Sequence, residues 1–283
     1  MSTAPDSHFD LQDFVRRVLA EDLGKGGDIT SKSTIASDAR FSAAMNCREP
    51  ITLAGLDIAA AFFRALDREV RIERPVNDGD SVPAGTVLMR LDGNARAMLA
   101  AERSALNTLQ HLSGIATLTR RYADAIAGTG AVLLDTRKTI PGLRLLDKYA
   151  ARMGGAENHR MRLDDGVLIK DNHVAVAGGV GEAVRAAQAA ATGLEVQVEV
   201  DRLDQIEVAL AAGADRLLLD NMPPATLREA VALVAGRVKC EASGGVNLDT
   251  IRAIAETGVD FISVGRITQS APAVDIGLDY ALQ

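Results

Sequence analysis

The chain has 283 residues, a net charge of −7 and 47% hydrophobic residues, which is typical of a globular protein with one large or two moderate domains. The acidic balance, 3% aromatic residues and absence of Trp argue against a nucleic-acid partner, because binding relies on cations and stacking side chains. No run reaches 18 apolar residues and the N-terminal sequence shows no apolar leader, so we expect a cytoplasmic protein with no membrane partner.

The first part of the chain mixes helices with short strands. Apolar residues at helical spacing predict a helix that begins near Leu11 and ends at Gly24. Beyond it we expect strand, turn and strand over 40–56, a helix over 57–67, short strands over 68–93 and a long helix over 94–128. We expect this long helix to kink near Gly114, because glycine weakens a helix interior.

From residue 131 onward, short apolar runs alternate with amphipathic helices that end at glycine. The runs are "AVLLD", "GVLIK", "EVQVEVD", "DRLLLD", "VKCEAS" and "DFISVG". Strands of nearly continuous apolar content between helices indicate a buried parallel sheet. Six strands are too few for a closed eight-stranded barrel, so the pattern favours an open, reduced α/β barrel, and a doubly wound sheet is the alternative.

Polar or glycine residues follow each of these strands. Parallel strands end at a common rim, which is where ligands bind in α/β barrels. The late strands end in Ser243, Gly244, Gly245 and Gly265. Glycine loops before helices expose backbone N–H groups to an anion, so they predict a phosphate site.

Positive charge is concentrated in one segment of an acidic chain. Residues 137–173 contain eight Arg and Lys against five Asp and Glu. Arg144, Lys148 and Arg152 share one helical face, which predicts a solvated surface, whereas Arg137, Lys138 and Lys170 follow strands directly. These strand-end cations predict a small polyanionic substrate, and Glu199 and Asp220 are candidate Mg²⁺ ligands.

Several motifs together resemble the quinolinate phosphoribosyltransferase family. They are "ERSALNTLQHLSGIAT", "DTRKTIPGLR", "KYAARMGGAENHRMRLDDGVLIKDNH", "VEVD", "LLLDNM", "EASGGV" and "GVDFISVGRIT", in one order from about residue 20 onward. The resemblance implies a pentosyltransferase of NAD biosynthesis that joins quinolinate to phosphoribosyl pyrophosphate with loss of CO2, using Mg²⁺ and no organic cofactor. Its N-terminal domain is an α/β sandwich, and its C-terminal domain is an open α/β barrel.

The resemblance also implies a domain layout and an oligomer. We expect a sandwich over 1–115, the barrel over 116–270, and a C-terminal segment over 271–283 that packs back on the first domain. The family works as a homodimer in which the partner's N-terminal domain completes each active site. Further assembly of dimers is left open.

Roles carry over to matching positions only. The resemblance implies that Arg137, His159, Arg160 and Lys170 bind the carboxylates of quinolinate, and that Lys138 meets phosphoribosyl pyrophosphate. Glu199 and Asp220 match the acids near the ribose and Mg²⁺. The 5′-phosphate cradle corresponds to Ser243, Gly244, Gly245 and Gly265. Arg103 matches the arginine supplied across the dimer interface.

The sequence departs from the family pattern at three positions. Ala156 stands where a third glycine is usual, and Arg266 and Gln269 stand where serine and histidine are common. These departures affect loops near the predicted site.

Three other functions can be set against this one. In a barrel lyase, Lys170 would form a Schiff base, as cationic neighbours can activate a lysine. A molybdenum-transport-associated relative of the same fold shares parts of the motifs. A biotinyl or lipoyl carrier fails, because no lysine occurs between Lys32 and Lys138.

Overall fold

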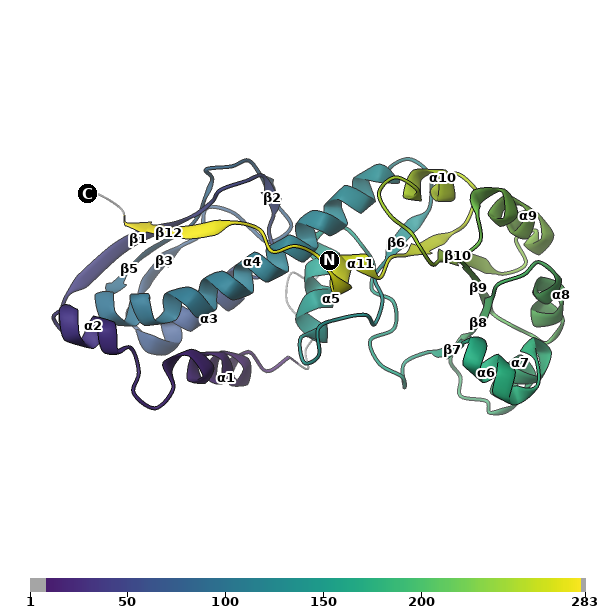
Figure 1. The fold of residues 1–283 in the computed structure, drawn as a ribbon, viewed down its shortest axis with the longest axis horizontal. Helices are drawn as coiled ribbons and strands as arrows, with labels where there is room; N and C mark the ends of the chain where they lie inside the picture. Colours follow the sequence, from purple (N-terminus) through teal and green to yellow (C-terminus); the bar gives the residue numbers. More distant parts are fainter. Residues whose placement is uncertain (1–8, 281–283) are drawn as a thin grey trace. The chain divides into compact units, whose positions relative to one another are not determined.

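A computed structural model describes residues 9–280, so the outermost residues of the predicted segments 1–115 and 271–283 lie outside the described residues. The chain forms two compact units (Figure 1). The first unit contains the residues up to Arg120, Leu145–Gly155 and those from Ser270 onward. The second contains Arg121–Arg144 and Ala156–Gln269.

The first unit is built on an antiparallel sheet with the strand order β12-β1-β5-β3. Its strands are β1 (Arg40–Cys47), β3 (Arg71–Glu73), β5 (Val87–Asn94) and β12 (Ile276–Tyr280). Two short strands, β2 (Ile51–Thr52) and β4 (Ser81–Val82), pair separately. Ala43, Met45 and Cys47 alternate along β1 and are all buried, so this face of the strand forms core.

Five helices accompany these strands in the described part of the chain. They are α1 (Leu11–Leu23), α2 (Ile29–Thr34), α3 (Leu56–Leu66), α4 (Ala95–Ala125) and α5 (Arg144–Met153). In α4, Gln110 Nε2 donates to the Ile276 carbonyl of β12 at 2.8 Å, and Thr117 Oγ1 accepts from the β2 residue Thr52 at 2.8 Å. These contacts tie α4 to strands from both ends of the sequence, as in an α/β sandwich.

Gly114 does not interrupt α4, which runs as one helix from Ala95 to Ala125. A Cβ added at Gly114 would lie 2.2 Å from the Pro272 carbonyl oxygen and 3.1 Å from Ala273 Cα. The glycine is therefore needed because another backbone segment approaches the helix closely. The predicted kink is therefore wrong. It was based on the low helix propensity of glycine, which says nothing about a contact with a distant segment.

The second unit contains a six-stranded parallel sheet. Its strands are β6 (Val132–Leu134), β7 (Val167–Ile169), β8 (Val196–Val200), β9 (Arg216–Asp220), β10 (Lys239–Ser243) and β11 (Phe261–Ser263). The spatial order β6-β11-β10-β9-β8-β7 follows the chain around a circle that is open between β6 and β7. This order confirms the open barrel and excludes the doubly wound sheet, whose order would reverse near its middle.

Six helices follow the strands β7 to β11 of this sheet along the described chain (Figure 1). They are α6 (Asp171–Ala177), α7 (Val180–Ala189), α8 (Asp204–Ala211), α9 (Pro224–Val234), α10 (Ile251–Ala255) and α11 (Arg266–Gln269). Val198, Leu217, Leu219 and Ile262 in the strands are fully buried, as a sheet covered on both faces requires.

The helical face predicted to be solvated is partly buried. Lys148 in α5 is fully buried, and its neighbour Asp147, also fully buried, lies 2.8 Å from His111 Nε2 in α4. Spacing identified the shared face of Arg144, Lys148 and Arg152 but could not show what covers it. Within residues 9–280, no helix combines the length and apolar composition needed to cross a membrane.

The close approach at Gly114 gives a stability prediction. We expect Gly114→Ala to lower the free energy of unfolding by about 1–3 kcal/mol through overpacking, although alanine favours helix by about 1 kcal/mol. Urea denaturation would measure this change.

Gly26→Ala is the matched control, because its added Cβ would meet Ile29 Cδ1 at an ordinary 3.7 Å. A Gly114→Ala protein as stable as the parent would contradict the close backbone approach.

Candidate active site

A cavity of about 730 Å³ opens at the carboxyl ends of the parallel strands. Every residue that lines it belongs to the second unit. The lining includes the predicted residues Arg137, Lys138, His159, Arg160, Lys170, Glu199, Asp220, Ser243, Gly244, Gly245 and Gly265. Convergence of parallel strand ends thus brings together residues that are more than 120 positions apart in the sequence.

Arg103 is the predicted site residue that belongs to the other unit. It lies on α4 in the first unit, and its side chain is exposed.

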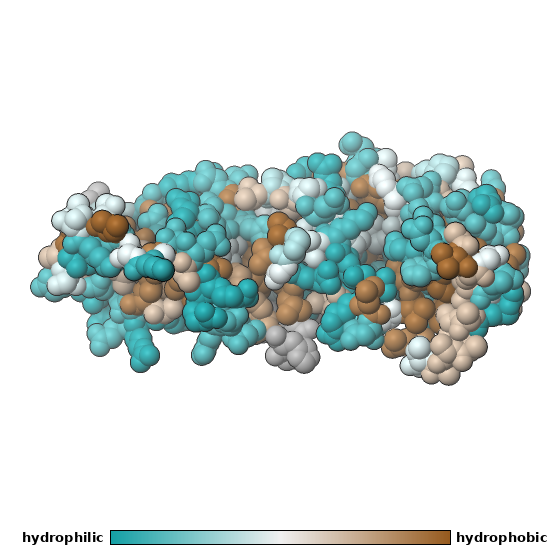
Figure 2. Space-filling view, turned by 60° about the horizontal axis from the view of Figure 1, so that its bottom comes forward, coloured by the Kyte–Doolittle hydropathy of each residue, from teal (hydrophilic) through white to brown (hydrophobic). Residues whose placement is uncertain are grey.

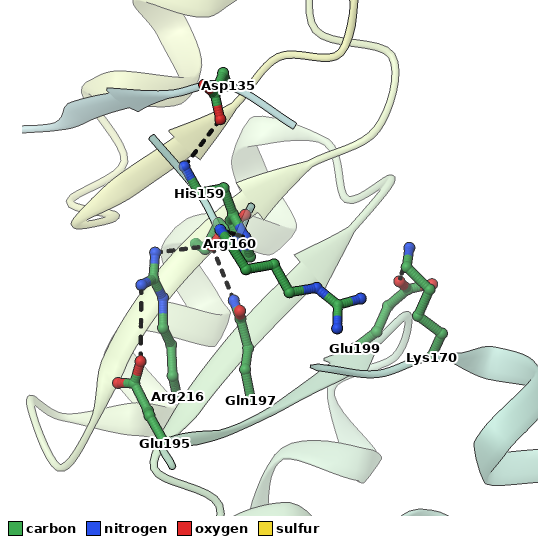
Figure 3. A network of polar contacts seen from close by, with 9 residues as sticks. Asp135, His159, Arg160, Lys170, Glu195, Gln197, Glu199 and Arg216 are labelled. Atoms are coloured by element: carbon green, nitrogen blue, oxygen red, sulfur yellow. Dashed lines mark hydrogen bonds and ion pairs between the residues drawn. The ribbon is translucent and has the colours of Figure 1, made fainter. Parts of the chain in front are cut away.

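The cationic side of the cavity combines a loop with two strand ends. Arg137 follows β6, and Lys170 follows β7 directly as the N-cap of α6. His159 and Arg160 lie two and three residues after the isolated bridge that joins Glu157 to Leu134 beside β6. Figure 3 shows the Arg160 side chain pointing toward the pair formed by Lys170 and Glu199.

Like charges crowd this part of the cavity. Burial and the neighbouring charge of Arg137 hold the pKa of Arg160 below its usual range. Arg160 Nη1 also donates to the Gly166 carbonyl at 3.1 Å. Two guanidinium groups held near one another in a partly buried cavity favour a bound anion, because the anion relieves their repulsion.

Two buried carboxylates hold His159 in place. Asp135 Oδ1 accepts from the His159 backbone N–H at 2.9 Å, and Asp135 itself is fully buried. Glu241 Oε2 lies 3.4 Å from His159 Nε2 and accepts from Arg216 Nη2 at 2.8 Å. The other ring nitrogen, Nδ1, accepts from the Arg160 backbone N–H at 2.8 Å. The imidazole is therefore held in one orientation.

Glu241 is ionised in spite of its burial. Burial alone would raise the pKa of its carboxyl, but the hydrogen bonds from His159 and Gln197 and the charge of Arg216 outweigh burial and lower the pKa. Its Oε2 also accepts from Gln197 Nε2 at 2.8 Å. A buried charge is tolerated when it is paired and hydrogen-bonded in this way.

Lys170 and Glu199 form an ion pair across the barrel rim. Lys170 Nζ lies 3.2 Å from Glu199 Oε2, and Glu199 is the less exposed partner. A Schiff-base lysine is activated by an apolar pocket or by an adjacent cation. The partner of Lys170 is a carboxylate, so this environment does not favour a barrel lyase.

Asp220 lies at the end of β9 in an unfavourable environment for a charge. Burial raises the pKa of its carboxyl, against the opposing effects of the Asn221 hydrogen bond and the charges of Lys170 and Lys138. Such a perturbed carboxyl in a cavity is typical of a functional site.

Asn221 connects Asp220 to the glycine loop. Its Nδ2 donates to Asp220 Oδ2 at 2.5 Å, and its backbone N–H donates to the Ser243 carbonyl at 2.9 Å. Asn221 has a φ of 57°, a left-handed conformation that asparagine tolerates better than most residues. A Cβ at Gly244 would lie 2.2 Å from Asn221 Oδ1, so the loop needs glycine there.

Sequence reasoning placed Asn221, Asp135 and Glu241 among the polar residues at the predicted rim but assigned them no role in the site. Asp135 and Asn221 directly follow β6 and β9, and Glu241 lies within β10, two residues before its carboxyl end, so position along a strand was the available signal. Their partners come from other strands, so the pairings could not be read from spacing.

The donor set limits what metal the site can hold. Among residues 9–280, no group of three or more His, Cys, Asp or Glu side chains is arranged to hold a metal ion. Glu199 and Asp220 are the acids predicted for this role. Two carboxylates fit Mg²⁺ that completes its coordination with substrate phosphates and water, and do not fit an all-protein cage.

The raised pKa of Asp220 predicts that removing its charge stabilises the folded protein, by an amount that depends on pH. The folded protein binds the Asp220 proton more tightly than the unfolded chain, so the ionised carboxylate destabilises the fold at neutral pH. We expect Asp220→Asn to raise the melting temperature at about pH 7.5, and this gain to shrink as the pH falls through the raised pKa toward 3.8.

Thermal denaturation of ligand-free protein at about pH 7.5 and about pH 4.5 would test this. Asp38→Asn, at an exposed carboxylate, serves as the control. A variant less stable than the parent at the higher pH would contradict the prediction.

Two family models together cover most of the chain. The C-terminal domain of quinolinate phosphoribosyl transferase matches residues 115–279, and its N-terminal domain matches residues 28–113.

Curated relatives align over nearly the whole chain. A nicotinate-nucleotide pyrophosphorylase [carboxylating] of Mycobacterium leprae is 44% identical, covering 97% of this chain and 99% of the relative. A quinolinate phosphoribosyltransferase [decarboxylating] of Nicotiana tabacum is 40% identical, covering 98% and 85%.

Solved structures share the fold closely. The nicotinate-nucleotide pyrophosphorylase of Francisella tularensis superposes with a TM-score of 0.91 at 43% identity, covering 96% of each chain. The corresponding structure from Ehrlichia chaffeensis gives 0.93 at 39% identity, covering 97% of this chain and all of the other.

Proposed function

The chain belongs to the quinolinate phosphoribosyltransferase family, and we propose that it transfers the phosphoribosyl group of phosphoribosyl pyrophosphate to quinolinate with loss of CO2. The products are nicotinate mononucleotide and pyrophosphate, as in NAD biosynthesis. One observation carries the proposal: a single cavity combines a cluster of cations with a glycine-rich loop at neighbouring strand ends.

The cationic side of the cavity suits a small aromatic dicarboxylate. Arg137, Arg160 and Lys170 supply positive charge, and the planar guanidinium groups match carboxylates with two parallel hydrogen bonds. His159, fixed between Asp135 and Glu241, borders the same space. A monocarboxylate would leave part of this charge without a partner.

The opposite side suits a phosphorylated sugar. Ser243 ends β10 and Gly244 and Gly245 follow it, where exposed backbone N–H groups bind phosphate oxygens well. Lys138 supplies a compact charge beside Gly265. Glu199 and Asp220 would bind the ribose hydroxyls and hold Mg²⁺, which neutralises charge on the pyrophosphate when bound.

In this mechanism the protein positions reactants and stabilises charge. The quinolinate ring nitrogen bonds to C1 of the ribose as the bond from C1 to pyrophosphate breaks. The resulting pyridinium accepts the electron pair released when the C2 carboxylate leaves as CO2, and C2 then takes a proton from water. The cations hold the ring in line with C1, so orientation and electrostatics supply the rate.

The family resemblance further suggests a homodimer with shared sites. The support from this chain is Arg103, which is exposed on α4 and free to reach a partner's cavity. We propose that Arg103 of one copy adds a further cation to the cavity of the other. Higher assembly and a cytoplasmic location stay predictions.

Substrate choice is the first test of the function. With Mg²⁺ and phosphoribosyl pyrophosphate, we expect mononucleotide and equimolar CO2 from quinolinate and no product from nicotinate. Chromatography and trapped CO2 would measure both. Folded protein that is silent with both acids would favour the molybdenum-transport-associated alternative.

Removal of one carboxylate partner gives the second test. We expect Arg137→Ala to reduce kcat/KM for quinolinate by an amount equivalent to about 2–5 kcal/mol, because a carboxylate of the bound substrate loses its charged partner in the cavity. Arg228→Ala, at an exposed arginine on α9, is the control. Unchanged activity in Arg137→Ala would remove this residue from the site.

Mixing inactive variants tests the shared site. We expect Arg103→Ala and Lys170→Ala to be nearly inactive alone, whereas mixed dimers regain activity. Random exchange in an equal mixture leaves about a quarter of the sites with neither substitution, because each mixed dimer has one intact site. No recovery, with exchange verified by mass spectrometry, would contradict sites shared between copies.

A further inference from the structure

Arg266 is a cation of the cavity that the proposed function has not used. It follows Gly265 directly and is the first residue of α11. It lines the same cavity as Gly244, Gly245 and Lys138, and its side chain is exposed.

Two other cations of the cavity are already engaged by the protein. Lys170 pairs with Glu199, and Arg160 donates to the Gly166 carbonyl. By contrast, in the part of the chain that the structure describes, the guanidinium of Arg266 makes no hydrogen bond or ion pair within the limits of 3.5 Å and 4.0 Å. A charge lining a cavity without a protein partner is available to a ligand of opposite sign.

Local contacts fix Arg266 next to Lys138. Thr268 Oγ1, in the same short helix as Arg266, donates to the Lys138 carbonyl at 2.8 Å. A Cβ on Gly265 would lie 2.8 Å from Lys138 Cδ, so the lysine stem runs directly past the glycine. The short helix that carries Arg266 is therefore hydrogen-bonded to the backbone of Lys138, and Gly265 packs against the lysine side chain.

We propose that Arg266 binds the 5′-phosphate of phosphoribosyl pyrophosphate and of the mononucleotide product. This inference rests on the proposed function and assigns a further residue to it. A phosphate between the loop of Gly244 and Gly245, after β10, and Gly265, after β11, receives backbone N–H groups, and Arg266 follows the last of these glycines. The guanidinium adds two parallel donors where Lys138 offers a point charge.

The assignment predicts an effect on one substrate only. We expect Arg266→Ser to raise KM for phosphoribosyl pyrophosphate roughly 10- to 150-fold, the range typical of a hydrogen bond to a charged group, and to leave KM for quinolinate unchanged. Arg266→Lys keeps the charge without the planar fork and should lie between the parent and Arg266→Ser. The penalty in Arg266→Ser should shrink at high salt, because salt screens an exposed charge.

Binding to fragments of the substrate locates the contact. Calorimetric titration of parent and Arg266→Ser protein with ribose 5-phosphate, and separately with pyrophosphate, would report on the two ends of the substrate. We expect weaker binding of ribose 5-phosphate and unchanged binding of pyrophosphate. Weaker binding of pyrophosphate alone would overturn the assignment to the 5′-phosphate.

A matched control separates local from general electrostatics. Arg228→Ser removes one exposed arginine from α9, outside the cavity, and should leave both KM values unchanged. If Arg228→Ser weakens the binding of ribose 5-phosphate as much as Arg266→Ser does, net charge accounts for the effect and the proposal fails. If the parent enzyme forms mononucleotide and Arg266→Ser matches it, this inference fails while the proposed function stands. A parent enzyme without product would count against the function itself.

Discussion

The cations of the cavity depend on carboxylates buried beneath them. Asp135 binds the backbone of His159, and Glu241 lies against its ring while also pairing with Arg216. The same ring accepts the backbone N–H of Arg160, so the position of this arginine is coupled to both acids. Charge at the binding surface is therefore placed by opposite charge inside the barrel. An apolar replacement of either acid would leave the substrate-facing cations present but free to reorient.

Much of the site could be predicted because parallel strands converge. Once the apolar runs of the second half are recognised as parallel strands, Lys170, Asp220 and Ser243 must lie at one rim, however far apart they are in sequence. Burial of charged residues could not be predicted in the same way. Spacing places Lys148 on a helix face, but whether that face meets water depends on packing between distant segments. The partners of Glu241 were hidden for the same reason.

The opening between β6 and β7 makes room for residues of the site. In a closed barrel these two strands would pair with each other, whereas here they are the two unpaired ends of the sheet and a long connection joins them. His159 and Arg160 come from this connection, and its bridge at Glu157 lies beside β6. The barrel thus loses one strand pairing and gains a segment whose side chains reach the cavity from a direction that strand ends cannot provide.

The pairing of β12 with β1 has a consequence for synthesis of the chain. Asn46 and Asp279 are neighbours in this sheet although 233 residues separate them. During translation, β1 therefore emerges early and waits with an unsatisfied edge until nearly all of the polypeptide has left the ribosome. The second unit, whose strands are contiguous in sequence, can fold in the meantime. The part of the protein made first is consequently the part completed last, and an exposed strand edge of this kind can pair with other chains in the interval.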